Sequence, residues 1–200
     1  MRDKKHALRA GALIQRGSLP VSEARASSGI IQEKVLHFPP YLTSPAVGLY
    51  SPIGNEVATE RIRDHAFTSG KNVFYPKARK ADGLCMIRVR SAEELKPGRY
   101  GILEPVGTEA MTDPDQQGLV VFVPGLAFDL HGRRLGRGKG HYDRLLGRLA
   151  EGATFVSLAY EFQIVEELPT EEWDRKVHHI ITERRTIDCR SFAPGSDWIS

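Results

Sequence analysis

The segment best suited to chemistry runs from Pro124 to Arg144 and reads PGLAFDLHGRRLGRGKGHYDR. Its centre, from Arg134 to Gly140, alternates glycine with cationic residues and is called the glycine loop below. Alternating glycines let the backbone turn sharply and approach a ligand closely, and N–H groups before a helix attract anions. Arg134, Arg137 and Lys139 add full charges, and arginine can hold two phosphate oxygens at once. The pattern therefore indicates a site for a polyphosphate.

The spacing separates this loop from two common phosphate-binding motifs. A Walker A loop needs Ser or Thr after its lysine, whereas Gly140 follows Lys139. The dinucleotide fingerprint G-x-G-x-x-G also fails, because His141 stands where a third glycine is needed after Gly136 and Gly138. A flexible basic surface loop is the alternative interpretation. The position of the loop between an apolar strand and a helix argues against that alternative.

Asp143 lies three residues into the helix expected after the loop. A first-turn carboxylate commonly does no more than interact with the helix dipole. The sharper interpretation is a ligand for Mg²⁺, which phosphoryl transfer usually requires. Spacing alone favours the dipole role, so both interpretations stay open at this point.

Helices and strands alternate in the elements expected to position the glycine loop. Apolar spacing and turn residues predict helices at 2–16, about 22–38 with Ser22 as cap, 55–70 with Asn55 as cap, and from 140 onward with Tyr142, Leu145, Leu146 and Leu149 on one face. Apolar runs predict strands at 46–50, 72–76, 84–89, 119–123, 154–160 and 179–182, whereas 91–115 reads as mostly loop. Strands of this kind are typical of a layered α/β fold with a largely parallel sheet. With no repeat or linker, residues 1–200 are expected to form one domain.

Composition sets broad limits on the function. The chain has 200 residues, 26% of them charged, and a formal net charge of +3, which suits an enzyme of anionic small molecules and does not demand a nucleic-acid partner. Its two cysteines, Cys85 and Cys189, have no metal-binding spacing and make no disulfide scaffold. Neither a signal peptide nor a membrane span is visible, so a cytoplasmic location is expected.

Taken together, the motifs resemble the 5-formyltetrahydrofolate cyclo-ligase family, also called methenyltetrahydrofolate synthetases. The glycine-rich signature carries the resemblance through Pro124 to Asp129, Gly132, Arg134 to Gly140, and Tyr142 to Arg144. Weaker blocks agree in order: Lys5 and Arg9; Glu56, Val57 and Thr59; Tyr100 to Ile102 with Glu104 and Pro105; Ala159, Glu161, Gln163, Leu168, Pro169 and Asp174; and 180–183. Two positions depart from the family, namely His141 in place of a second Tyr and His179 where Asp is common. The tail 184–200 matches no family element.

The resemblance implies an activity and a set of roles. The reaction would close 5-formyltetrahydrofolate, including polyglutamylated forms, into 5,10-methenyltetrahydrofolate with ATP and Mg²⁺, releasing ADP and phosphate. The fold would be a Rossmann-like sheet flanked by helices, of the NagB/RpiA-like class. The resemblance implies metal binding by Asp143 and Asp174 and catalysis by Lys139, Arg137 and Tyr142. It implies folate binding by Glu56, Tyr50, Tyr142 and Gln163. The residues implied to bind ATP are Lys5, Arg9, Arg134, Gly136, Arg137, Gly138, Lys139, Gly140, His141 and Tyr142.

Plainer alternatives accompany these implied roles. Lys5 and Arg9 would otherwise form a solvated basic face, Glu56 an early helix carboxylate, Asp174 an exposed acidic turn, and Tyr142 a core residue. For the whole protein, one alternative is an α/β enzyme such as a sugar-phosphate isomerase, which would turn over without ATP. Another is a nucleic-acid-binding module with steeply salt-dependent RNA binding. The extent of the resemblance favours the ligase. A monomer with small-molecule partners, without nucleic acid or membrane, is expected.

Overall fold

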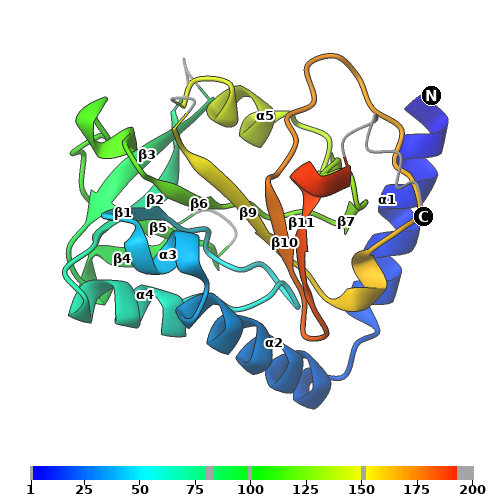
Figure 1. The fold of residues 1–200 in the computed structure, drawn as a ribbon, viewed down its shortest axis with the longest axis horizontal. Helices are drawn as coiled ribbons and strands as arrows, with labels where there is room; N and C mark the ends of the chain where they lie inside the picture. The colour runs from blue at the N-terminus through cyan, green and yellow to red at the C-terminus, as the bar shows by residue number, and fades with distance from the viewer. Residues whose placement is uncertain (1, 80–82, 99–100, 150–151, 193–200) are drawn as a thin grey trace.

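A seven-stranded sheet forms the centre of the fold in the computed structural model, which describes residues 2–79, 83–98, 101–149 and 152–192 (Figure 1). The strand order is β11-β10-β9-β6-β1-β2-β3. The strands are β1 (Ala46–Gly48), β2 (Asn72–Arg79), β3 (Gly83–Val89), β6 (Val120–Phe122), β9 (Thr154–Leu158), β10 (His179–Ile181) and β11 (Thr186–Asp188). The pairs among β2, β1, β6, β9 and β10 are parallel, and the edge strands β3 and β11 are antiparallel. The predicted α/β fold with a largely parallel sheet is confirmed.

Helices cover both faces of this sheet. Helices α2 (Val21–Leu36), α3 (Pro39–Thr43) and α4 (Glu60–Thr68) lie on one face and α5 (His141–Leu146) on the other, and the remaining helix is α1 (Arg2–Gly17). Side chains alternate between the faces along each strand, so Phe122 packs in the core beneath α2, α3 and α4, whereas Val121 packs in the core beneath α5. Figure 1 shows α1 standing apart from both layers, beside the ends of the strands. No helix among the described residues combines the length and apolar content needed to cross a membrane.

Two expected helix caps are wrong. Helix α2 begins at Val21 after Pro20 and has no side-chain cap, so Ser22 lies inside its first turn. Helix α4 begins at Glu60 with Thr59 at the cap position, four residues after the expected cap. The Asn55 amide instead donates to the backbone carbonyls of Arg16 and Leu19, at 3.2 and 3.0 Å. Asn55 therefore joins the end of α1 to the loop after β1, a long-range contact that a local capping rule does not detect.

The segment expected to be mostly loop contains a small second sheet. Strand β4 (Leu95–Pro97) pairs antiparallel with β5 (Leu103–Pro105), and 3₁₀ turns occur at Ala92–Glu94 and Pro114–Gln116. Each strand is three residues long and includes a proline, so the sequence carries no alternation to reveal it. The hydroxyl of Ser51 donates to the Leu103 carbonyl at 2.6 Å and joins this sheet to the loop after β1. Tyr100, part of the family motif, lies outside the described residues.

The remaining differences concern element ends. Helix α5 stops at Leu146, so Leu149, expected on its apolar face, follows the helix and packs partly buried against the core. Helix α2 ends at Leu36, two residues before the expected end, and the prolines that follow it also begin the short α3. Strand β11 was not expected, and it forms an antiparallel edge within the tail that matches no family element.

Candidate active site

The glycine loop is presented by a short hairpin that follows β6. Strands β7 (Ala127–Phe128) and β8 (Arg134–Leu135) pair antiparallel, and the loop continues from β8 into α5. The turn between them is held by Asp129, which is fully buried and accepts backbone hydrogen bonds from His131, Arg133 and Leu168 at 3.0 to 3.1 Å. Because β6 belongs to the parallel part of the sheet, the loop lies at the carboxyl edge, where α/β proteins bind ligands.

Two glycines of the loop have backbone angles that other residues adopt only with strain. Gly138 has a φ of 95° and Gly140 a φ of 63°. A Cβ atom at Gly138 would also lie 3.3 Å from the guanidinium carbon of Arg9. Arg9 itself donates from Nε to the Gly136 carbonyl at 2.9 Å. Arg9, predicted from the sequence to bind ATP, thus packs directly against the glycine loop.

The three cations of the loop have different surroundings. Arg137 and Lys139 are exposed, and Arg137 also contacts a carboxylate, Glu56, at 3.2 Å. The side chain of Arg134 is only 3% exposed, and its Nη2 donates to Oδ1 of Asp143 at 2.7 Å. Its Nη1 donates to the Pro124 carbonyl at 3.4 Å. Arg134 therefore ties the hairpin to α5, whereas Arg137 and Lys139 are the cations that face outward.

Glu56, predicted to bind the substrate, lies at the meeting point of the glycine loop, α1 and the loop after β1. Its Oε1 atom is 3.2 Å from Nη2 of Arg16 and 3.2 Å from Nη2 of Arg137. Its Oε2 atom accepts a hydrogen bond from the Ile53 N–H at 3.0 Å. The side chain is 8% exposed, so this carboxylate is buried but balanced by two cations.

Arg16 is a residue of this site that sequence reasoning missed. Its side chain is 6% exposed and pairs with Glu56. A signal was present, because Lys5, Arg9 and Arg16 are separated by four and seven residues and so share one face of a helix. The long N-terminal helix α1 thereby brings three cations to the carboxyl edge of the sheet.

The two predicted metal ligands are brought close together. Oδ1 of Asp143 accepts a hydrogen bond from the backbone N–H of Arg175, the residue after Asp174, at 3.3 Å. Oδ2 of Asp174 accepts from Nζ of Lys5 at 2.8 Å, and Lys5 also contacts Glu171 at 3.0 Å. Burial alone would lower the pKa of Lys5, but its hydrogen bonds to the two carboxylates outweigh burial and raise that pKa. Lys5 is therefore a fixed cation beside Asp174.

These carboxylates fit a magnesium ion that shares its ligands with a phosphate. Among the described residues, no group of three His, Cys, Asp or Glu side chains forms a closed metal cage. Mg²⁺ is commonly held by one or two carboxylates together with substrate phosphates and water, so two carboxylates beside a cationic loop suit it. Asp143 and Asp174 carry oxygen atoms of the kind that Mg²⁺ prefers.

Tyr50 and Gln163 are buried, and Tyr142 is partly buried. Burial raises the pKa of Tyr50 and of Tyr142, so both phenols stay protonated. The Tyr50 hydroxyl donates to the Val57 carbonyl at 2.8 Å. The guanidinium carbon of Arg134 lies over the Tyr142 ring, 5.9 Å from the centre of that ring. Gln163 donates to the Gly125 and Leu126 carbonyls at 3.3 and 3.0 Å. Tyr50 and Gln163 thus fix the backbone around the site.

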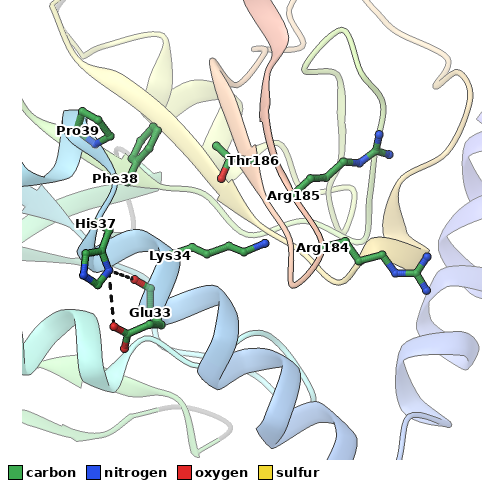
Figure 2. A pocket seen from close by; sticks show the side chains of 8 residues that line it. All are labelled: Glu33, Lys34, His37, Phe38, Pro39, Arg184, Arg185 and Thr186. Carbon is green, nitrogen blue, oxygen red and sulfur yellow. Dashed lines mark hydrogen bonds and ion pairs between the residues drawn. The ribbon is translucent and has the colours of Figure 1, made fainter.

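Two cavities border this region without containing the glycine loop. One, of about 430 Å³, lies between α1 and the turn after β9 and is lined by Gln163 and mostly apolar side chains. The other is an open groove of about 650 Å³ between the end of α2 and β11 (Figure 2). In that groove Lys34 donates to the Thr182 and Glu183 carbonyls, and Arg185 pairs with Glu161 at 2.7 Å. This groove contains no glycine loop, and two of its cations are bonded to groups of the fold. The glycine loop, with its N–H groups ahead of α5, therefore remains the better candidate for phosphate binding.

His141 is expected to tolerate replacement by tyrosine. The ring is exposed, and Nδ1 lies 3.1 Å from Nη2 of Arg144. Partial burial, Arg144 and Lys139 lower the pKa of His141, so the ring is neutral at pH 7. His141→Tyr therefore removes no charge there, and we expect stability within about 0.5 kcal/mol and a KM for ATP within about twofold. Thermal unfolding and steady-state kinetics check this; a tenfold rise in KM would show that the imidazole contacts the nucleotide.

The fold and the site together define an α/β protein with a cationic glycine loop beside a buried carboxylate, at the carboxyl edge of a mainly parallel sheet. The sequence profile of the 5-formyltetrahydrofolate cyclo-ligase family matches residues 1–183. The chain therefore belongs to the 5-formyltetrahydrofolate cyclo-ligase family, and the family prediction made from the sequence is confirmed.

Individual relatives agree with this assignment. The 5-formyltetrahydrofolate cyclo-ligase of Mus musculus is 31% identical over 191 residues, covering 90% of this chain and 93% of the mouse protein. The Escherichia coli K12 enzyme of the same name is 30% identical over 152 residues, covering 74% and 84%. The solved 5,10-methenyltetrahydrofolate synthetase of Aquifex aeolicus has a TM-score of 0.81 at 36% identity and covers 93% of each chain. That of Mycoplasma pneumoniae has a TM-score of 0.72 at 25% identity, covering 90% and 98%.

Proposed function

We propose that this protein is an ATP-dependent 5-formyltetrahydrofolate cyclo-ligase that forms 5,10-methenyltetrahydrofolate, ADP and phosphate. The family match over residues 1–183 supports the reaction. The observation that carries the proposal in this chain is the exposed pair of cations, Arg137 and Lys139, on a strained glycine loop beside the buried Glu56. This arrangement suits a polyphosphate and a pterin bound next to each other.

The chemistry needs an activated formyl group, because the carbonyl of an N-formyl group is a poor electrophile. The formyl oxygen forms a bond to the γ-phosphorus of ATP while the bond to the leaving ADP breaks. N10 then bonds to the formyl carbon and gives up its proton. The carbon–oxygen bond breaks last, so the formyl oxygen departs within inorganic phosphate and the methenyl bridge remains. Positioning and charge neutralisation supply most of the acceleration in phosphoryl transfer.

The side chains divide these tasks among themselves. Lys139 and Arg137 neutralise charge on the phosphates, and Arg9 holds the loop that carries them. Glu56 accepts N–H groups of the pterin, whose guanidine-like edge matches a carboxylate. Tyr142, which stays protonated, borders both ligands from beneath Arg134. Arg134, Tyr50 and Gln163 act indirectly, because each fixes the backbone or a carboxylate at the site.

Magnesium belongs to this proposal as well. Asp143 and Asp174 would hold the ion, which when bound neutralises phosphate charge. Lys5 stays paired with Asp174 and keeps that carboxylate beside the loop. We further propose a single catalytic domain that acts as a monomer on small molecules, including polyglutamylated folates. The cytoplasmic location and the absence of a nucleic-acid partner stay predictions from the sequence.

The proposed reaction is tested by following methenyltetrahydrofolate formation by absorbance. We expect product from 5-formyltetrahydrofolate only when ATP and Mg²⁺ are both present, with one ADP released per product. Replacing ATP by ADP, or chelating the metal, should abolish product formation. Turnover without ATP would contradict the proposal and favour an isomerase-like activity, and salt-sensitive RNA binding without folate turnover would favour a nucleic-acid-binding module.

A further inference from the structure

Two arginines share one oxygen of Glu56, but they are held very differently. Arg16 has a side chain that is 6% exposed, and its Nη1 also donates to the Gly125 carbonyl at 3.4 Å. Arg137 is 48% exposed, and its one hydrogen bond among the described residues is the contact with Glu56. Arg137 also lies between two glycines of the loop, where the backbone has the most freedom. Arg16 is therefore a fixed partner of Glu56, whereas Arg137 can leave it.

The hydrogen-bonding capacity of Glu56 requires one partner to leave when folate binds. A carboxylate has about four lone-pair positions for hydrogen bonds. Three are used by Arg16, Arg137 and the Ile53 N–H. A guanidine-like pterin edge presents two N–H groups, so one more position is needed than is free. Since Arg16 and Ile53 belong to buried or backbone structure, the position that can be released is the one used by Arg137.

The same arginine is needed at the phosphates under the proposed function, on which this inference rests. We propose that Arg137 is a latch on Glu56, meaning that its contact with Glu56 blocks a hydrogen-bonding position needed by the pterin. A nucleoside triphosphate opens this latch by drawing Arg137 to its phosphates. The pterin then gains the released position on Glu56. Because coupling between two binding sites is reciprocal, folate binding also frees Arg137 for the nucleotide. Arg16 stays with Glu56 throughout and keeps the buried carboxylate oriented.

The latch is tested by titration calorimetry with 5-formyltetrahydrofolate, with and without a saturating non-hydrolysable ATP analogue and Mg²⁺. In the unmodified protein we expect the analogue to lower the folate Kd by about 5- to 10-fold. This is at the low end of the range typical of coupling between two binding sites, because Arg137 is half-exposed. In Arg137→Gln the latch is absent. Folate should then bind about 5-fold more tightly without nucleotide, and the analogue should change its Kd by less than about twofold.

Lys139→Gln is the matched control, because it removes one cation from the same loop without touching Glu56. We expect this variant to bind the analogue more weakly but to keep the unmodified folate Kd in the absence of nucleotide. A gain in folate affinity confined to Arg137→Gln would support the latch, since loss of a phosphate-binding cation alone does not produce it.

Several results would overturn the latch. If Arg137→Gln binds folate without nucleotide no more tightly than the unmodified protein does, Arg137 does not block Glu56. The latch would also be wrong if the unmodified protein binds both ligands but neither ligand changes the Kd of the other. Normal turnover in that case would leave the proposed function intact. If the unmodified protein binds neither ligand and forms no product, the latch and the proposed function fail together.

Discussion

Replacing Lys139 by alanine is expected to lower kcat/KM by about 10²- to 10³-fold, the loss typical of removing one preorganised group that stabilises transition-state charge. Lys139 is exposed, and its ammonium group makes no hydrogen bond or ion pair with another described residue. Its charge is therefore not needed by the fold and is available to the phosphates. Loss of an exposed side chain should change the free energy of unfolding by less than about 0.5 kcal/mol. Steady-state kinetics with varied ATP and thermal unfolding measure the two effects.

Lys71→Ala is a suitable control for the loss of one lysine. Lys71 directly precedes β2, so it lies at the opposite edge of the parallel sheet from the glycine loop. Its Nζ donates to the Leu42 and Ser44 carbonyls. We expect Lys71→Ala to affect stability slightly and kcat/KM by less than about twofold. If Lys139→Ala keeps unmodified turnover and ATP affinity, the phosphate site has been assigned to the wrong residue.

Part of the site was predictable because its signals are local. The glycine loop can be recognised from spacing, since the glycines and the cations alternate within seven residues that follow an apolar strand. Lys5 and Arg9 were singled out by the family resemblance, because helix geometry shows only that residues four apart share one face. The parallel sheet was predictable for a similar reason, since strands buried on both faces leave continuous apolar runs such as 119–123.

The pairing of charges across the chain could not be predicted in the same way. Arg16 and Glu56 are 40 positions apart, and Lys5 and Asp174 are 169 positions apart. Which cation meets which carboxylate depends on how α1 packs against the loops, and periodicity within one element carries no information about that packing. Asn55 illustrates the consequence: a local rule assigns it to a helix cap, whereas its amide binds two carbonyls at the end of α1.

The long-range pairs have a common element in α1. Through Lys5 it contacts the segment around Asp174, through Arg9 the glycine loop, and through Arg16 the buried Glu56. The proposed metal, nucleotide and folate sites thus share one rigid helix face. A displacement of α1 would disturb all three sites together, whereas the hairpin and α5 are joined separately, through Arg134 and Asp143.

Replacing Asp143 by alanine should have the largest effect on stability. Its carboxylate is the acid partner of Arg134, whose side chain is 3% exposed, so Asp143→Ala leaves a buried cation unpaired. Breaking such a pair costs about 3 kcal/mol. For a protein of this size that corresponds to a fall in Tm of roughly 6 to 12 °C. Asp143→Asn keeps an oxygen that accepts from Arg134 and should lose less, about 1 to 2 kcal/mol.

The asparagine variant also separates the structural role of Asp143 from its proposed metal role. An amide oxygen is a poorer ligand for Mg²⁺ than a carboxylate, so folded Asp143→Asn should need more Mg²⁺ for half-maximal turnover, by about tenfold or more. Thermal unfolding and Mg²⁺ titrations of initial rate measure the two roles independently. An unchanged Tm in Asp143→Ala would mean that Arg134 finds another partner. An unchanged Mg²⁺ requirement in Asp143→Asn would leave the carboxylate with its structural role alone, because a true ligand cannot be neutralised without weakening the site.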